Sequence, residues 1–416
     1  MEKTFYRQFI LCHIERNEVQ SKHPLERVPY ETSSVSKFSI RMQKTLAKSK
    51  YYAQKKDIFL SKNILLKSNF LAHLTPTQNF WKGVRGKHFS QKRLSPQKNK
   101  ENSGGFFVMN KQDFYAAATS LGIGNTPLIP YEEDFDADIY VKNEAMNASG
   151  SVKDRPALAM ILQAEEDGLL HPGDTIVEAT SGNMGIALAY IGAKRGYRVL
   201  LTMPETMTVE RRQLLQGLGA QLVLTEGALG MKGAIEQAQL LGMEKGHLLI
   251  RQFENAANVK AHYLSTADEI AEKLDRVDIF VAGVGTGGTL IGTGKRLKEI
   301  FPNVKVVAVE PAGSPAISQG HGGKHAIQGI GAGFVTKLYD SSVVDQVQTV
   351  SDEEALDMFY MLNLKLGYCC GISSAANIVA ATRYANDPMY KGANIVTLFP
   401  DGDDRYVTML KNAPKQ

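Results

Sequence analysis

The sequence predicts an α/β protein with mostly parallel sheets, and three observations support this class. Short apolar runs alternate with amphipathic helical stretches from about residue 121 onward. Glycine-rich turns stand where an apolar run passes into a helical stretch, and 33 of the 37 glycines follow residue 108. Hydrophobic residues make up 43% of the chain and charged residues 22%, as in globular proteins with a large core. Helices that cover both faces of a parallel sheet produce this alternation.

The first half of the alternation spans residues 174–253. Four short apolar runs there have the length of buried strands. They are Asp174–Ala179, Tyr197–Met203, Gln221–Thr225 and His247–Phe253. Between them lie three amphipathic stretches that are long enough for helices. They are Met184–Arg195, Val209–Leu218 and Met231–Leu241.

The second half spans residues 278–399 and repeats the pattern. Its predicted strands are Asp278–Val284, Val304–Glu310 and Asn394–Phe399. Its predicted helices are Gly287–Ile300, a helix from Ser351 to about Leu366, and a helix near Ala375–Tyr384. Ser351 and Glu354 have the spacing of a capping box, which marks the start of a helix.

Residues 1–108 differ from the rest of the chain. They hold 21 Lys and Arg against 7 Asp and Glu, a net charge of +14, while residues 109–416 hold 27 against 36, a net −9. They contain no repeat, no sustained period and no metal-ligand spacing. We interpret them as a basic extension that is either disordered or not native to the protein, with Met109 the true start in the second case. Contact of this extension with nucleic acid is an alternative that we do not favour.

The composition also bears on the cellular compartment in which the protein works. The chain has three cysteines, too few for a disulfide framework, and no apolar run reaches the length of about 18 residues that a membrane-spanning helix needs. The sequence therefore predicts a cytoplasmic protein without a membrane partner. The adjacent pair Cys369 and Cys370 is interpreted as two small buried residues.

The strongest local motif is Gly285-Thr286-Gly287-Gly288-Thr289, between a predicted strand and a predicted helix. Glycines let the backbone approach an anion closely, and the N–H groups at a helix start point toward it. The motif therefore suits one phosphate group. Its spacing is neither that of a Walker loop nor that of a dinucleotide fingerprint. A tight glycine turn without a ligand is the alternative for the motif taken alone.

Two further segments carry chemistry. Thr180-Ser181-Gly182-Asn183 follows a predicted strand and suits a carboxylate, although helix capping explains it equally well. Ser151 is placed to cap a helix with Lys153 in its first turn. The positive end of the helix dipole favours the neutral amine, which is the form that attacks a carbonyl. A lone lysine at a helix start is more often a solvated surface charge.

The order of the motifs along the chain removes these ambiguities. The motifs are Asn125-Thr126-Pro127-Leu128, Ser151-Val152-Lys153, Thr180–Asn183, Pro204-Glu205-Thr206-Met207, Gly285–Thr289, Gln328–Gly333 and Gly371-Ile372-Ser373-Ser374. Together they closely resemble the cysteine synthases (O-acetylserine sulfhydrylases) of the cysteine synthase/cystathionine β-synthase family, which are fold-type II pyridoxal phosphate enzymes. The resemblance covers about residues 121–410.

The resemblance implies two three-layer α/β domains of the tryptophan synthase β-like kind. Residues 109–146 and 258–416 would form the larger cofactor-binding domain, and residues 147–257 the smaller, mobile substrate-loop domain. The implied cofactor site consists of Lys153, Asn183, Gly285, Thr286, Gly287, Gly288, Thr289 and Ser373. The implied substrate site consists of Thr180, Ser181, Gly182, Asn183, Gln252 and Gly329. No metal is implied.

Each implied role follows from the resemblance. Lys153 looks like the catalytic lysine that binds pyridoxal 5′-phosphate and later removes the α-proton of the substrate. Residues Gly285–Thr289 look like the phosphate cradle, and Asn183 matches the partner of the ring hydroxyl. Ser373 matches the serine that faces the pyridine nitrogen. A serine leaves that nitrogen unprotonated, which favours β-elimination over transamination.

The implied reaction is β-replacement, in which sulfide displaces the acetate of O-acetylserine and gives L-cysteine. The alternative is a cystathionine β-synthase-like enzyme, or one that uses thiosulfate or phosphoserine. Two departures from the family pattern bear on this choice: Met184 stands where threonine is usual, and Asp401–Asp404 replaces a serine-rich stretch. The family also suggests a homodimer, and a complex with the C-terminal tail of serine acetyltransferase.

Overall fold

The computed structural model describes residues 110–413, so the predicted basic extension lies outside the described residues. Two sheets form the framework. The larger has six strands in the order β1 (Leu128–Pro130), β2 (Asp138–Asn143), β10 (Asn394–Phe399), β7 (Ile279–Gly283), β8 (Lys305–Pro311) and β9 (Gln346–Val350). The smaller has four strands in the order β5 (Gln221–Thr225), β4 (Arg198–Pro204), β3 (Thr175–Ala179) and β6 (His247–Leu249). All neighbours are parallel except β1 and β2. The predicted α/β class with mostly parallel sheets is confirmed.

Eleven α-helices accompany the strands within the described residues. They are α3 (Lys111–Leu121), α4 (Asp154–Glu166), α5 (Asn183–Arg195), α6 (Val209–Gly217), α7 (Gly230–Leu241), α8 (Ala256–Leu264), α9 (Thr266–Ala271), α10 (Gly288–Ile300), α11 (Asp352–Tyr360), α12 (Ile372–Ala385) and α13 (Val407–Lys411). Short helical turns include η1 (Glu144–Met146) and η3 (Met361–Lys365), which is a π-helix that continues α11.

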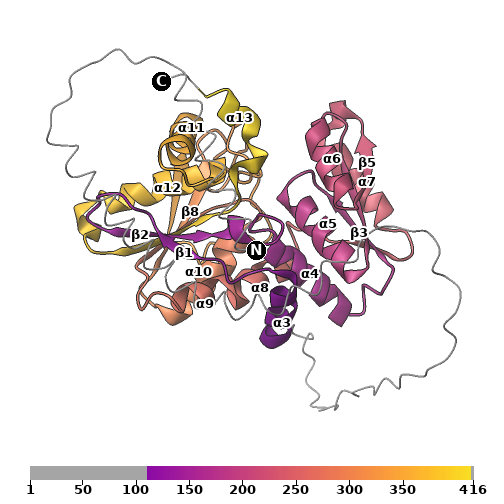
Figure 1. The fold of residues 1–416 in the computed structure, drawn as a ribbon, viewed down its shortest axis with the longest axis horizontal. Coiled ribbons are helices and arrows are strands. Elements are labelled where there is room, and N and C mark those ends of the chain that lie inside the picture. Colours follow the sequence, from indigo (N-terminus) through magenta and orange to yellow (C-terminus); the bar gives the residue numbers. More distant parts are fainter. Residues whose placement is uncertain (1–109, 414–416) are drawn as a thin grey trace, which may run out of the picture. The chain divides into compact units, whose positions relative to one another are not determined.

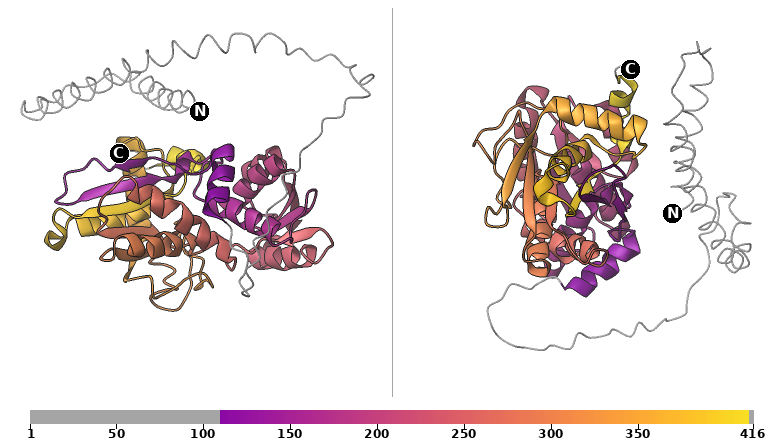
Figure 2. Two further views of the ribbon diagram at one scale, coloured as in Figure 1. Left: turned by 90° about the horizontal axis from the view of Figure 1, so that it is seen from below. Right: turned by 90° about the vertical axis from the view of Figure 1, so that its left-hand side faces the viewer.

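Helices cover both faces of the six-stranded sheet. Alternate residues of β7 show this: Ile279 packs in the apolar cluster with α11 and α12, whereas Phe280 packs in the cluster with α9 and α10. The ribbon views place α12 and α10 on opposite faces of this sheet (Figures 1 and 2). Because strand side chains alternate between faces, a strand buried on both sides reads as a continuous apolar run.

The four-stranded sheet is also covered on both faces. Ile176 of β3 lies in a cluster with α4 and α5, and Val177 packs with Ala238 of α7 on the other side. The cluster around α4 and α5 also takes in Phe114 of α3 and Ala261 of α8. The division into a larger domain of residues 109–146 and 258–416 and a smaller domain of residues 147–257 remains a prediction.

Three local features differ from the sequence-based expectation. Strand β6 ends at Leu249 rather than Phe253, because Arg251 has a φ of 56° and the N–H groups of Arg251 and Gln252 turn to the Glu178 carboxylate. Helix α12 begins at Ile372, three residues before its predicted start. Cys370 is buried as expected, but Cys369 is only half-buried and has a φ of 51°. The capping box of Ser351 and Glu354 is confirmed at the start of α11.

Helix lengths and hydropathy also bear on membrane insertion. Within residues 110–413, none of the helices has the combined length and apolar character that spanning a bilayer requires.

Candidate active site

A cavity of about 310 Å³ lies where strands of both sheets end. Residues that follow β3, β6, β7 and β10 line it, as do the residues at the starts of α4 and α12. Ligands of open α/β sheets bind at this carboxyl edge. Twelve of the predicted site residues line the cavity: Lys153, Thr180, Ser181, Gly182, Asn183, Gln252, Gly285, Thr286, Gly287, Thr289, Gly329 and Ser373. Of the thirteen predicted site residues, only Gly288, which is buried, does not line the cavity.

Three helices that start at this cavity share one feature. The N-cap residues of α5, α10 and α12 are Gly182, Gly287 and Gly371. A glycine has no side chain to bond the first N–H groups of its helix, although in α10 the Gly288 N–H reaches the Thr286 hydroxyl at 3.4 Å. The positive ends of three helix dipoles thus surround one cavity.

Lys153 is the N-cap of α4, which begins at Asp154. It therefore stands just before the helix rather than in its first turn, and its N–H donates to the Ser151 hydroxyl at 3.3 Å. Burial lowers the pKa of the Lys153 amine, and the charges of Asp401 and Glu144 oppose this shift in part. The amine consequently loses its proton more readily than an exposed lysine does.

The turn Gly285–Thr289 has the geometry of an anion cradle. Gly287 has a φ of 92°, and a Cβ on Gly288 would lie 1.9 Å from Oδ1 of Asn258. Only glycine therefore fits at Gly288 without displacing its neighbour. The amide of Asn258 also donates to the Thr286 hydroxyl at 3.1 Å, which fixes the threonine at the cavity wall. Asn258 is a supporting residue that the sequence patterns did not indicate.

Glu178 of β3, two residues before the turn Thr180–Asn183, binds the segment that carries Gln252. The Glu178 carboxylate accepts the N–H of Arg251 at 2.9 Å and that of Gln252 at 3.4 Å, which places Gln252 beside the turn. Burial raises the pKa of Glu178 to about 7. The Thr180 hydroxyl accepts the Gly182 N–H at 3.2 Å, so the turn is ordered by its own residues.

Asp401 is the main site residue that sequence reasoning left out. It follows β10, lines the cavity and is 2% exposed. Its Oδ2 accepts the Asn183 amide N–H at 2.7 Å. Burial raises the pKa of this carboxyl, whereas the hydrogen bond from Asn183 lowers it. The predicted strand Asn394–Phe399 was the available signal, because side chains just past a parallel strand lie at the ligand edge.

Apolar side chains form the remaining wall. Met184, Met231 and Phe253 line the cavity, and the sequence patterns did not indicate the last two. Met184 is 2% exposed and belongs also to the apolar cluster around α5. A thioether therefore stands directly after the turn Thr180–Asn183, where the resemblance led us to expect a threonine hydroxyl.

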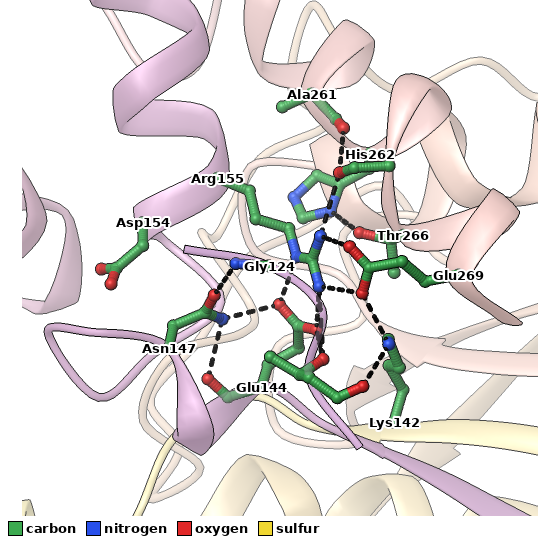
Figure 3. A network of polar contacts seen from close by, with 12 residues as sticks. Gly124, Lys142, Glu144, Asn147, Asp154, Arg155, Ala261, His262, Thr266 and Glu269 are labelled. Atoms are coloured by element: carbon green, nitrogen blue, oxygen red, sulfur yellow. Dashed lines mark hydrogen bonds and ion pairs between the residues drawn. The ribbon is translucent and has the colours of Figure 1, made fainter. Parts of the chain in front are cut away.

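A buried ionic network fixes the start of α4 (Figure 3). Nε of Arg155 lies 2.7 Å from Oε2 of Glu144, and its Nη1 lies 2.6 Å from Oε1 of Glu269. Lys142 Nζ lies 2.7 Å from the other oxygen of Glu269. Because Arg155 stands two residues after Lys153, this network holds the backbone that carries the lysine.

Comparison with known proteins shows to which protein family the chain belongs. Residues 119–401 match the family model described as "Pyridoxal-phosphate dependent enzyme". The chain belongs to this family of pyridoxal-phosphate dependent enzymes. The resemblance stated from the motifs is confirmed, and so is pyridoxal 5′-phosphate as the cofactor.

Relatives of this pyridoxal-phosphate dependent enzyme carry one recurring name. The chain is 47% identical over 291 residues to "Cysteine synthase" of Staphylococcus aureus (strain Mu50 / ATCC 700699), covering 69% of this chain and 94% of the relative. It is 46% identical over 303 residues to "Cysteine synthase" of Haemophilus influenzae (strain ATCC 51907 / DSM 11121 / KW20 / Rd), covering 70% and 96%. The crystal structure of cysteine synthase from Entamoeba histolytica is similar with a TM-score of 0.69 at 38% identity, covering 77% and 96%.

The residues present fit the cofactor of the family. Gly285, Thr286, Gly287 and Thr289 line the cavity at the start of α10, where the N-cap Gly287 has no side chain to fill the place of a phosphate. Lys153, with its lowered pKa, lines the same cavity, as does the buried Ser373. A nucleophilic amine suits the aldehyde of pyridoxal phosphate, and an anion cradle suits its phosphate.

Proposed function

We propose that this enzyme replaces the acetate of O-acetylserine by sulfide and so forms L-cysteine and acetate. The observation that carries the proposal is the meeting of Lys153, the Gly285–Thr289 cradle and the Thr180–Asn183 turn in one cavity. The named relatives support it, because those with 46–47% identity are cysteine synthases. We do not propose the cystathionine β-synthase-like, thiosulfate or phosphoserine alternatives, which these relatives do not favour.

We assign the residues as follows. Bound pyridoxal phosphate supplies an electron sink that lets the Cα proton of an amino acid leave. Lys153 binds the cofactor and, once free, takes the proton at Cα of the substrate as its general base. Its lowered pKa supports this role, because the amine is neutral for more of the time near neutral pH. Gly285, Thr286, Gly287, Gly288 and Thr289 hold the phosphate.

The substrate carboxylate is assigned to the N-terminus of α5. Thr180, Ser181, Gly182, Asn183, Gln252 and Gly329 form this part of the cavity. Gly182 leaves the first N–H groups of α5 unpaired by any side chain of its own, which suits an anion. Asn183 also faces the ring hydroxyl in this assignment. Ser373 faces the pyridine nitrogen as a neutral group, which favours elimination of acetate over transamination.

Finer properties are part of the same proposal. We propose a homodimer, a cytoplasmic location and binding of the C-terminal tail of serine acetyltransferase in the cleft. The small number of cysteines, three in the whole chain, supports a reducing compartment. The smaller domain, residues 147–257, would close over the substrate as it binds.

Product analysis of the purified holoenzyme tests the function. O-acetylserine, serine and phosphoserine are each supplied with sulfide and with homocysteine, and the amino-acid products are identified by mass. Cysteine formed chiefly from O-acetylserine and sulfide is the expected result. Cystathionine as the main product, or equal use of phosphoserine, would contradict the proposal.

A further inference from the structure

Asp401 lies where three of the four segments that carry the assigned cofactor residues meet. Its backbone forms a β-bridge with Ser151, and the neighbouring Pro400 carbonyl accepts the Val152 N–H at 2.8 Å, next to Lys153. The Asp401 carbonyl accepts the Gly371 N–H at 3.0 Å, just before Ser373. The side chain holds Asn183 at 2.7 Å. Pro400 and Asp401 together therefore contact all three of these segments by hydrogen bonds.

The carboxylate is confined to one position. Its Oδ2 accepts both the Asn183 amide and the Tyr406 hydroxyl, the latter at 3.2 Å. A Cβ on Gly371 would lie 2.0 Å from Oδ1, so the glycine leaves just enough room for the carboxylate. Oδ1 is buried and accepts no hydrogen bond from the described residues. Both donors therefore act on one oxygen, and the carboxylate is held against rotation.

This arrangement sets the orientation of the Asn183 amide. The oxygen and the nitrogen of an asparagine amide are similar in size, so their hydrogen-bond partners decide which of the two atoms faces Asp401. A carboxylate only accepts hydrogen bonds, so the amide nitrogen must face Asp401. The nitrogen has two N–H groups, and Asp401 uses one of them. The second is left to donate into the cavity that Asn183 lines.

We propose that Asp401 is a positioning residue, which orients the Asn183 amide so that its second N–H donates to the ring oxygen of the cofactor. The proposal rests on the assignment of Asn183 to that oxygen under the proposed function. Asp401 acts through Asn183 and touches neither substrate nor cofactor in this role. The charge-assisted bond is stronger than a bond between neutral groups, so it suffices to fix the amide.

The experiment compares Asp401→Ala, Asp401→Asn, Asn183→Ala and the double variant of Asp401→Ala with Asn183→Ala. The readouts are the affinity of each apoprotein for pyridoxal phosphate and the visible absorption spectrum of the bound cofactor. Asp401→Ala should weaken binding about 10-fold and shift the spectrum in the same direction as Asn183→Ala. Asp401→Asn keeps an acceptor oxygen for the amide and should restore most of both properties.

The double variant decides whether the two residues act as one. In the Asn183→Ala background, Asp401→Ala should change the affinity less than about 2-fold, because the amide that it orients is gone. Multiplied effects of the two changes would overturn the proposal, and so would a wild-type spectrum and affinity in Asp401→Ala. Asp404→Ala is the matched control, because this nearby carboxylate is exposed and its side chain is 67% accessible.

The experiment distinguishes a folding defect of the Asp401 variants from a loss of cofactor binding. Melting curves show whether Asp401→Ala folds, and if it does not, Asp401→Ser supplies the same test, since its shorter side chain does not reach the amide. Neither readout needs turnover. A wild-type enzyme that binds the cofactor but forms no cysteine would contradict the proposed function while leaving the test of Asp401 intact.

Discussion

At the scale of single residues, burial sets the ionisation of the groups around the cavity more than charge pairing does. Desolvation is the largest cause of the shift at Lys153, Glu178 and Asp401. It lowers the pKa of the amine and raises the pKa of each carboxyl, so all three groups are moved toward their neutral forms. Burial therefore opposes the charged form of each group, although the hydrogen bond from Asn183 favours the ionised carboxylate of Asp401.

Removal of Lys153 tests the catalytic assignment. Lys153→Ala should abolish covalent attachment of the cofactor, measured as the mass added after borohydride reduction. Turnover should fall by at least about 10²–10⁴-fold, which is the usual worth of a general base. Lys260→Ala is the control, because burial also lowers the pKa of Lys260 although it does not line the cavity. A Lys153→Ala enzyme that still gains the mass and turns over would remove the residue from its role.

Glu178 makes stability depend on pH. Burial raises the pKa of Glu178 from its ordinary value of 4.5 to about 7 in the folded protein, so the folded state keeps a proton that the unfolded state releases. The stabilisation that this proton gives to the folded state is fully present below about pH 4.5 and is lost as the pH rises through 7. The free energy of unfolding should therefore fall by up to about 3 kcal/mol. Urea unfolding at pH 5 and pH 7.5 measures it.

The matched variants isolate this group from other titrations. Glu178→Gln should flatten the difference between the two pH values, because the amide has no proton to lose. Glu205→Gln should leave the difference unchanged, since Glu205 is exposed although it also accepts a backbone N–H, that of Gly227. An identical pH dependence in Glu178→Gln and the wild type would show that Glu178 titrates at its ordinary value.

At the scale of elements, the junction of β7 with α10 shows how a turn becomes a binding site. The chain leaves the strand at Gly283, adopts a left-handed conformation at Gly287 and starts the helix at Gly288. Asn258 of α8 packs against the glycine that starts the helix, and the Thr336 hydroxyl donates to the Thr286 carbonyl at 2.7 Å. The cradle is therefore built by three separate segments rather than by the glycine turn alone.

A single methyl group should disturb this cradle. Gly288→Ala puts a Cβ 1.9 Å from Asn258 Oδ1, so the asparagine must move and its hydrogen bond to Thr286 is lost. The apoprotein should bind pyridoxal phosphate at least about 10-fold more weakly, measured by spectral titration. Gly217→Ala is the control: it lies in α6 with nothing within 4 Å of the added Cβ, and it should bind as the wild type does. Equal affinities of the two variants would argue against a phosphate at this turn.

At the scale of the whole molecule, the Arg155 network joins three apolar clusters. Arg155 comes from α4, Glu144 from η1 after β2, and Glu269 from α9, and these elements pack in different clusters. The side chain of Arg155 is fully buried. Two carboxylates surround its charge, and the pKa of Glu144 falls to about 2 as Arg155 and Lys142 favour its ionised form against burial.

Breaking this network should destabilise the protein. Arg155→Met leaves two buried carboxylates with only Lys142 as a counter-charge, and unfolding should become easier by about 3–5 kcal/mol. Denaturant unfolding measures the loss. Arg383→Met removes an exposed pair with Glu354 and should cost no more than about 1 kcal/mol. Similar losses in the two variants would show that the buried network contributes no more than a surface ion pair.

The strands and turns that the sequence predicted well are those whose structure depends on residues close to them along the chain. β5 and β10 have their predicted bounds, and the cradle and the substrate turn lie at the predicted strand ends, because apolar runs and glycine turns are local patterns. Features that depend on distant partners were not predictable in this way. β2 contains a buried lysine whose partner Glu269 comes from another element, and Asp401 meets Asn183 across 218 residues of sequence.

The position of β10 bears on how the chain is made. β10 is the last strand of the described residues, yet it lies between β2 and β7 in the six-stranded sheet. On the ribosome, β6 completes the four-stranded sheet 145 residues before β10 begins, which at about 5–20 residues per second is roughly 7–30 seconds earlier. β7 ends 111 residues before β10 begins, and over that part of synthesis β2 and β7 lack the strand that pairs with both of them. The strand that fills this gap is also the one that delivers Asp401, so assembly of the sheet and completion of the cofactor pocket are a single late event in biosynthesis.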